Sequence, residues 1–162
     1  MDKVSEIEIS LDKDLNIIIG QAHFIKTVED LYEALVTSFS GIEFGIAFNE
    51  ASGDRLIRND GNDQELIKKS TELAEKIGAG HSFVILLKNA YPINVLNRIK
   101  QVMEVVNIYV ATANPLKVLV YDDGKEGRAI ISVIDGKKPL GIEKEEDKEK
   151  RRKFLRDIGY KR

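Results

Sequence analysis

The chain contains two histidines, His23 and His81, and the residues around each could admit a ligand. An imidazole is mostly neutral at pH 7, and a neutral ring nitrogen can act as a nucleophile. Lys26 adds a positive charge near His23 at the expected start of a helix, where anions bind. The glycines of Gly78–Gly80 leave room for a ligand beside His81. The alternative for both histidines is a structural role, in which the imidazole only hydrogen-bonds a loop.

A second group of polar side chains runs from Asn49 to Arg58, directly after an apolar segment. Asn49 and Glu50 carry groups that recognise the hydroxyls or the exocyclic amine of a nucleoside, and Ser52 lies close by in the sequence. The guanidinium groups of Arg55 and Arg58 are suited to phosphate, because they present paired N–H donors. An ordinary polar turn is the alternative interpretation of this segment.

Three more side chains are candidates for ligand binding. Asn94 follows Pro92 in the expected first turn of a helix, and Thr112 and Asn114 stand where a strand is expected to end. Each can donate and accept hydrogen bonds. Taken alone, none of the three is specific for a function.

Several classes of site are excluded by the sequence. It has no G-x-x-x-x-G-K-[ST] phosphate loop, no G-x-S-x-G elbow and no H-E-x-x-H motif. The chain has no Cys, so thiolate metal sites are excluded, and two histidines are too few for a His-rich site. We expect no dedicated metal site. Mg²⁺ remains a candidate helper of phosphoryl transfer through Asp or Glu oxygens, although no pattern demands it.

The charge balance argues against nucleic acid as a partner. Lys and Arg number 25 and Asp and Glu 27, for a formal charge of −2, so the chain is not a polycation that holds nucleic acid by charge alone. The tail, residues 142–162, carries nine basic and six acidic side chains. It predicts a charged amphipathic helix that docks through Phe154, Leu155 and Ile158. A nucleic-acid-binding tail is the less favoured alternative.

Hydrophobic periodicity predicts strands alternating with helices. Three helices are expected to begin at Thr27, Asn62 and Pro92. Short connections near the end of the chain suggest antiparallel neighbours there. The whole is predicted to be an α/β fold, a single compact domain over residues 1–162 with a mixed β-sheet flanked by helices. The expected strands cover residues 4–9, 15–19, 42–48, 55–59, 81–87, 105–111, 116–121 and 128–134.

Local signals predict the helix ends. Thr27 with Asp30 three residues later resembles a capping box, and Asn62 is expected to cap the second helix. Gly78 stands where a left-handed residue ends that helix. One face of the strand at 42–48 carries only small side chains near its end, including Gly45. Close packing of a helix is favoured there, and a flat ligand is the alternative.

The length of 162 residues suits one domain with a sizeable core, and 43% hydrophobic residues exclude wholesale disorder. The first residues do not resemble a secretory signal, and the longest wholly apolar run, Phe83–Leu87, is too short to cross a membrane. We therefore expect a soluble cytoplasmic protein with no membrane partner. High charge without Cys or Trp is a compositional hint of a thermophile.

Five peptides together resemble the adenosine-specific kinase family, a small archaeal and bacterial family. The resemblance covers nearly the whole chain. It implies an α/β subunit that recognises adenosine or AMP, a homo-oligomer (a trimer or a multiple of one), and a phosphoryl-transfer activity. The peptides are Gly20–Leu31, Phe44–Gly53, Gly78–Phe83, Pro92–Asn97 and Ala111–Pro115.

The resulting hypothesis is that one histidine accepts a phosphoryl group and passes it to the 5′-hydroxyl of adenosine. His81 is favoured by a small margin because its glycines give it room, whereas His23 has the better environment for an anion. Glu50 would activate the hydroxyl or hold the ribose, and basic side chains would neutralise the developing charge. The rival hypothesis is a non-catalytic sensor that binds adenosine or AMP, which the missing phosphate loop favours.

Overall fold

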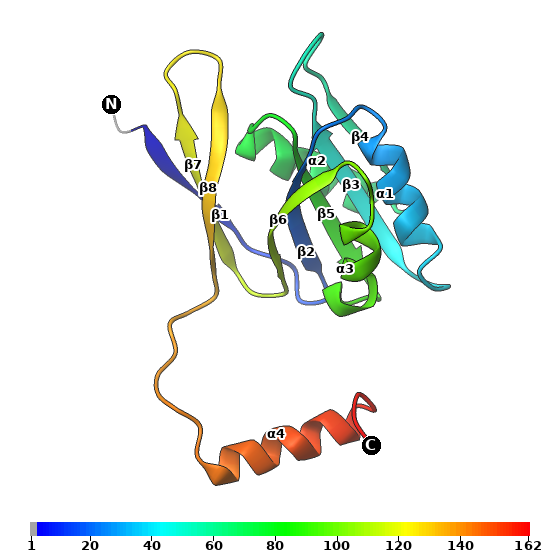
Figure 1. The fold of residues 1–162 in the computed structure, drawn as a ribbon, viewed down its shortest axis with the longest axis vertical. Coiled ribbons are helices and arrows are strands. Elements are labelled where there is room, and N and C mark those ends of the chain that lie inside the picture. The colour runs from blue at the N-terminus through cyan, green and yellow to red at the C-terminus, as the bar shows by residue number, and fades with distance from the viewer. Residues whose placement is uncertain (1–2) are drawn as a thin grey trace.

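The computed structural model describes residues 3–162 as eight strands and four helices (Figure 1). In chain order they are β1 (Val4–Ile9), β2 (Asn16–Ala22), α1 (Thr27–Val36), β3 (Glu43–Asn49), β4 (Ile57–Gly61), α2 (Gln64–Ile77), β5 (Ser82–Lys88), α3 (Pro92–Lys100), β6 (Val105–Thr112), β7 (Leu116–Asp122), β8 (Arg128–Asp135) and α4 (Glu145–Asp157).

The strands form two sheets, and the α/β class with helices on the sheet faces is confirmed. One sheet has the order β4-β3-β5-β2-β6 and the other β1-β7-β8, and every described pairing is antiparallel. The expected mixed sheet is therefore wrong. The helical crossovers do join strands that run the same way, such as β2 and β3. An antiparallel strand, here β5, lies between them, so no parallel pair forms.

The five-stranded sheet is buried on both faces, which explains the apolar run of β5. On one face α1 and α3 cover a core that contains Ile18, Leu31 and Phe44. On the other face α2 and the three-stranded sheet cover a second core, to which Ile17 and Val118 belong. Successive residues of β2 thus enter different cores, as the strand period of two requires.

The small side chains of β3 face α2, so the helix-packing interpretation is confirmed. A Cβ built on Gly45 would lie 2.2 Å from the backbone carbonyl carbon of Leu66 in α2. Ala47 is fully buried in the same core. The helix backbone therefore touches the strand where glycine leaves room for it.

The helix ends match the predictions in part. Gly78 ends α2 in the left-handed conformation with φ 58°, as expected. Asp63, and not Asn62, caps α2 by accepting from Leu66 N–H, while Asn62 bonds the backbone of β3 and the residue before it. The capping box expected at Thr27 is wrong. Lys26 is the N-cap of α1 and makes no side-chain capping hydrogen bond, and Thr27 Oγ1 donates to the carbonyl of Phe24.

The C-terminal helix does not dock on its own chain, contrary to expectation. After Gly136 the chain runs away from the two sheets and ends in α4, which stands apart from them (Figure 1). No residue of α4 is buried, and Phe154 and Ile158 are both exposed. Across residues 3–162, we find no helix with the length and apolar character needed to cross a membrane.

Candidate functional site

The ends of three neighbouring strands meet at one end of the five-stranded sheet. Phe83 at the start of β5 lies opposite Gly20 near the end of β2 and opposite Phe48 near the end of β3. The loop after β2 carries His23, and the residue before β5 is His81. The antiparallel register therefore brings the two histidines to the same end of the sheet, although 58 residues separate them along the chain.

A hollow of about 440 Å³ lies at this end. Its volume is in the range that holds a small molecule. It is lined by His23, Phe24, Ile25, Glu50, Ser52, Gly53, Asp54, Leu56, Arg58 and His81.

The backbone of His81 is left-handed, with φ 64°. Residues with a Cβ adopt this conformation at a cost, so the surrounding bonds must hold it. His81 N–H donates to the carbonyl of Asn49 at 2.7 Å, and the His81 carbonyl accepts from Ala22 N–H at 2.9 Å. The imidazole stacks on the ring of Phe48, with centroids 5.8 Å apart and planes at 12°. Two strands and one aromatic ring thus fix where the imidazole points.

Glu50 connects His81 to Arg58. Its Oε1 lies 3.4 Å from His81 Nε2 and accepts from Ala51 N–H at 3.0 Å, while Oε2 lies 3.5 Å from Arg58 Nε. Burial acts to raise the pKa of the Glu50 carboxyl. The Ala51 hydrogen bond, the His81 contact and the Arg58 charge outweigh burial and hold that pKa below its ordinary value. The side chain is therefore an ionised, largely buried acceptor beside the imidazole.

The wall around His23 contains exposed apolar side chains that were not among the predicted site residues. Phe24, Ile25 and Leu56 are each more than half exposed and all line the hollow. Their signal in the sequence is an apolar side chain within an otherwise polar connection. Such surfaces accept the face of a purine.

Lys26 does not line this hollow. Its Nζ lies 2.7 Å from Asp30 Oδ2 and 3.0 Å from Oε1 of the buried Glu104. The Asp30 hydrogen bond first, and then that of Glu104, raise the pKa of the Lys26 ammonium. Two carboxylates thus neutralise a charge that the sequence analysis assigned to phosphate.

Arg55, in the loop between β3 and β4, and Arg58, in β4, line different hollows. Arg58 faces the histidines, whereas Arg55 lines a second hollow of about 530 Å³ and lies 3.5 Å from Glu126. The far wall of that second hollow includes Arg128, whose guanidinium donates to Asp122 and to two carbonyls at the end of α2. The structure therefore does not bring the two predicted arginines to one site.

Asn49 is buried and forms hydrogen bonds within the protein. Its Nδ2 donates to the carbonyl of Ala74 at 2.9 Å and to Ser82 Oγ at 3.0 Å. These bonds join β3 to α2 and to β5. Ser52, in contrast, is exposed in the loop and lines the hollow.

The other three candidates lie away from the hollow. Thr112 pairs with Ile17 at the start of β2, five residues, or roughly 17 Å, from the end that holds the histidines. Thr112 Oγ1 and Asn114 Nδ2 both donate to Asp135 Oδ1, at 2.7 and 3.1 Å, and so connect β6 to β8. Asn94 Oδ1 accepts from the backbone N–H before α3 at 2.9 Å.

Within residues 3–162, no three His, Asp or Glu side chains come close enough together to hold a metal ion. Phosphate oxygens would have to supply most ligands of any Mg²⁺ at the hollow, because Mg²⁺ demands near-octahedral oxygen coordination.

Comparison with known proteins gives this arrangement a context. The family model for adenosine specific kinase matches residues 7–161. The chain belongs to the adenosine-specific kinase family. This member of the family resembles the crystal structure of the PH1918 protein from Pyrococcus horikoshii OT3, with a TM-score of 0.93 and 50% identity over 98% of each chain. A search of curated proteins finds no match.

Proposed function

We propose that the chain binds adenosine or AMP in the hollow between His23 and His81 and transfers a phosphoryl group to or from adenosine. One observation carries the proposal. Two imidazoles, two carboxylates and a guanidinium line a hollow of about 440 Å³ in a chain of the adenosine-specific kinase family. The donors and acceptors are few and convergent, as in sites that orient a small ligand.

The exposed apolar side chains provide the surface for the purine. Phe24 offers an aromatic face, and Ile25 and Leu56 extend it. Ser52 and Arg58 lie on the same hollow, with a hydroxyl for the ribose and a guanidinium for the phosphate.

His81 is the proposed phosphoryl acceptor. When Nε2–H is donated to Glu50, the lone pair of the imidazole is on Nδ1. The Nδ1 lone pair attacks the terminal phosphorus of the donor, and the bond from phosphorus to the bridging oxygen breaks. That oxygen leaves with the electron pair, and Glu50 stabilises the positive imidazole ring that results.

The second step transfers the group to adenosine. The 5′-oxygen attacks phosphorus, the N–P bond breaks, and its electron pair returns to Nδ1 of His81. His23 accepts the hydroxyl proton, and Arg58 stabilises the charge on the transferred group. Mg²⁺ is proposed to bind mainly through phosphate oxygens of the donor. The working protein is proposed to be a homo-oligomer, a trimer or a multiple of one.

The test is to incubate the protein with a panel of labelled phosphoryl donors and look for acid-labile, alkali-stable label. We expect label in the wild type and in His23→Asn, and no label in His81→Asn. Asparagine is the replacement of choice because it tolerates the positive φ at position 81. Loss of label in His23→Asn alone would transfer the role to His23.

Calorimetric titration with AMP separates the proposal from its rival. Binding in all three proteins, with labelling only where His81 is present and turnover highest in the wild type, supports transfer. Tight AMP binding with no label and no turnover from any donor would identify a sensor. Absence of AMP binding would overturn both.

A further inference from the structure

The C-terminal arm, residues 137–162, leaves apolar side chains in solvent. Leu140 and Ile142, in its extended part, are fully exposed, and Phe154 of α4 is 59% exposed. The described hydrogen bonds of α4 and of the turn after it stay within the arm. The arm therefore gains nothing from burial against its own chain in this arrangement (Figure 1).

An arm that packs on no other surface is expected to be only marginally stable. An isolated helix of 13 residues is marginal in water, and most helices are stabilised by burying a face. Leu140 and Ile142, on either side of a bend at Gly141, are also both fully exposed. Both features indicate a segment that packs on another surface.

The charge distribution indicates that the arm packs on a second copy of this chain. The arm holds eleven Lys or Arg and six Asp or Glu, a net charge of +5, whereas residues 1–136 carry −7. The basic arm is thus complementary to the acidic remainder of the chain. The arm points away from the acidic part of its own chain, because the segment after Gly136 runs away from the two sheets (Figure 1).

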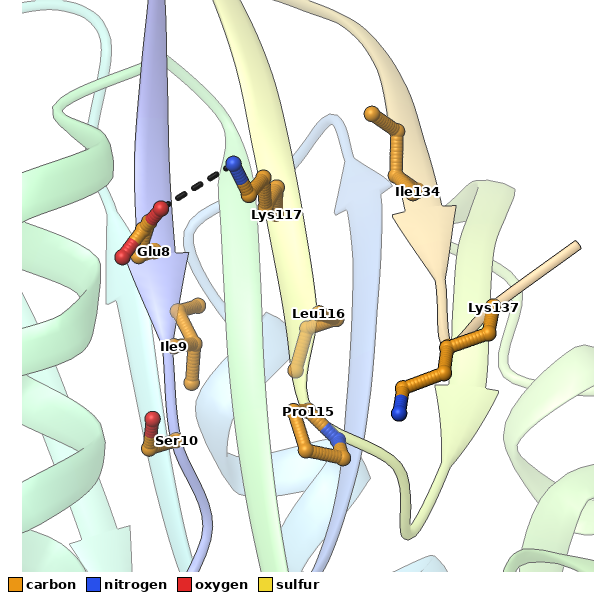
Figure 2. Close-up of a pocket in the computed structure, with 9 residues that line it drawn as sticks. Glu8, Ile9, Ser10, Pro115, Leu116, Lys117, Ile134 and Lys137 are labelled. Carbon is orange, nitrogen blue, oxygen red and sulfur yellow. Dashed lines mark ion pairs between the residues drawn. The ribbon is translucent and has the colours of Figure 1, made fainter.

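An apolar groove lies where the arm begins. It has a volume of about 240 Å³, and its walls include Ile9 of β1, Leu116 of β7 and Ile134 of β8. Figure 2 shows these side chains together with Lys137, the first residue of the arm, at the rim. Lys117 and Glu8 form an ion pair of 3.0 Å at the same groove. The groove is separate from the hollow proposed to bind the nucleoside, since the two share no lining residue.

We propose that the arm of each copy packs on a neighbouring copy, with Leu140 and Ile142 in the groove between β1, β7 and β8. The arm and the groove lie next to each other on each chain. One symmetry axis near Gly136 therefore places the arm of each copy beside the groove of a neighbouring copy. The assembly closes by exchange of identical segments. The inference does not depend on the proposed nucleoside chemistry.

The absence of cysteine from the chain permits a clean cross-linking test. A tagged chain with Ile134→Cys is coexpressed with an untagged chain with Leu140→Cys, and both are oxidised mildly. We expect a disulfide-linked heterodimer on a non-reducing gel, because a disulfide requires Cα atoms within about 7 Å. The matched control carries Ile131→Cys in place of Ile134→Cys. Ile131 is exposed on the same strand but does not line the groove.

A second measurement covers the arm itself. By light scattering, we expect the wild type to be a multiple of the monomer, and Leu140→Asp with Ile142→Asp to raise the dissociation constant at least tenfold. Gly141→Asp is the control, because it adds a carboxylate in open space between the two positions and removes no apolar side chain. Circular dichroism confirms that each variant is folded.

Three results would overturn the proposal. One is a wild-type chain that is monomeric at all concentrations. Another is a heterodimer yield no higher than that of the Ile131→Cys control. The third is a cross-link within one chain when Ile134→Cys and Leu140→Cys are combined, since the arm would then occupy its own groove. AMP binding is measured in parallel and is expected to be the same in all arm variants.

Discussion

His81 occupies a backbone conformation that costs a residue with a Cβ about 1–3 kcal/mol. The bonds from His81 N–H to Asn49 and from Ala22 N–H to the His81 carbonyl offset this cost. Asn49 in turn is held by α2 and β5 through its own amide. At the residue scale, the position of the imidazole therefore depends on buried hydrogen bonds that contact no ligand.

Glu50→Gln is expected to lower the free energy of unfolding at neutral pH and to have a smaller effect in acid. The pKa of Glu50 lies below its ordinary value of 4.5, so the folded state favours the ionised form. That stabilisation is fully present above about pH 4.5, the pKa of an unfolded glutamate, and is lost as pH falls through the folded pKa.

Urea unfolding of the wild type and of Glu50→Gln at pH 7 and at steps down to pH 3.5 measures this difference. Glu126→Gln is the control, because Glu126 is 81% exposed and its ion pair with Arg55 is long, at 3.5 Å. A gap between wild type and Glu50→Gln that stays constant over the whole range would contradict the assignment.

At the element scale, a glycine contact and a cap help to place α2 against the sheet, beside the apolar core that the helix covers. Gly45 lets the backbone at Leu66 approach β3, and Asp63 caps the helix through Leu66 N–H. The same helix ends at Gly78, three residues before His81. A shift of α2 is therefore expected to displace His81 through the short connection that begins at Gly78.

Gly45→Ala is expected to lower the free energy of unfolding by about 3 kcal/mol, because the added Cβ overpacks against a helix backbone that cannot rotate away. Chemical denaturation monitored by circular dichroism measures the change. Gly141→Ala is the matched control and should be nearly neutral, since a Cβ there meets nothing within 4 Å. Equal stability of the two variants would show that α2 is less tightly packed than this contact indicates.

For the whole molecule, the chain divides into two sheets with their helices and an arm that lies outside them (Figure 1). The two cores share the five-stranded sheet, so the hollow between His23 and His81 rests on a sheet that is buried on both faces. The arm has no such support within the chain. Its stability is expected to depend on assembly.

The midpoint of thermal unfolding is therefore expected to rise with protein concentration, on the order of 3 °C for each tenfold increase, because folding and association are coupled. Differential scanning calorimetry at three concentrations measures the rise. The combined Leu140→Asp and Ile142→Asp variant should show a much smaller rise. A wild-type midpoint that does not change with concentration would contradict exchange of the arms.

Local features of the structure were already determined by the sequence. Strand β1 occupies the predicted residues 4–9, Gly78 ends α2, and Pro92 begins α3. Each depends on neighbours a few positions away, through alternation, backbone freedom or a fixed φ. The segments that carry the two histidines were recognisable for the same reason.

Only the tertiary structure decided which of these segments meet. The strand order brings His23, Glu50 and His81 to one end of the sheet and leaves Thr112 and Asn114 at the other. Lys26 pairs with Glu104 and does not line the hollow, and the arm extends away from the two sheets instead of packing on them. Such contacts join residues far apart in the chain, and their energies depend on strand pairing and burial, which no local pattern records.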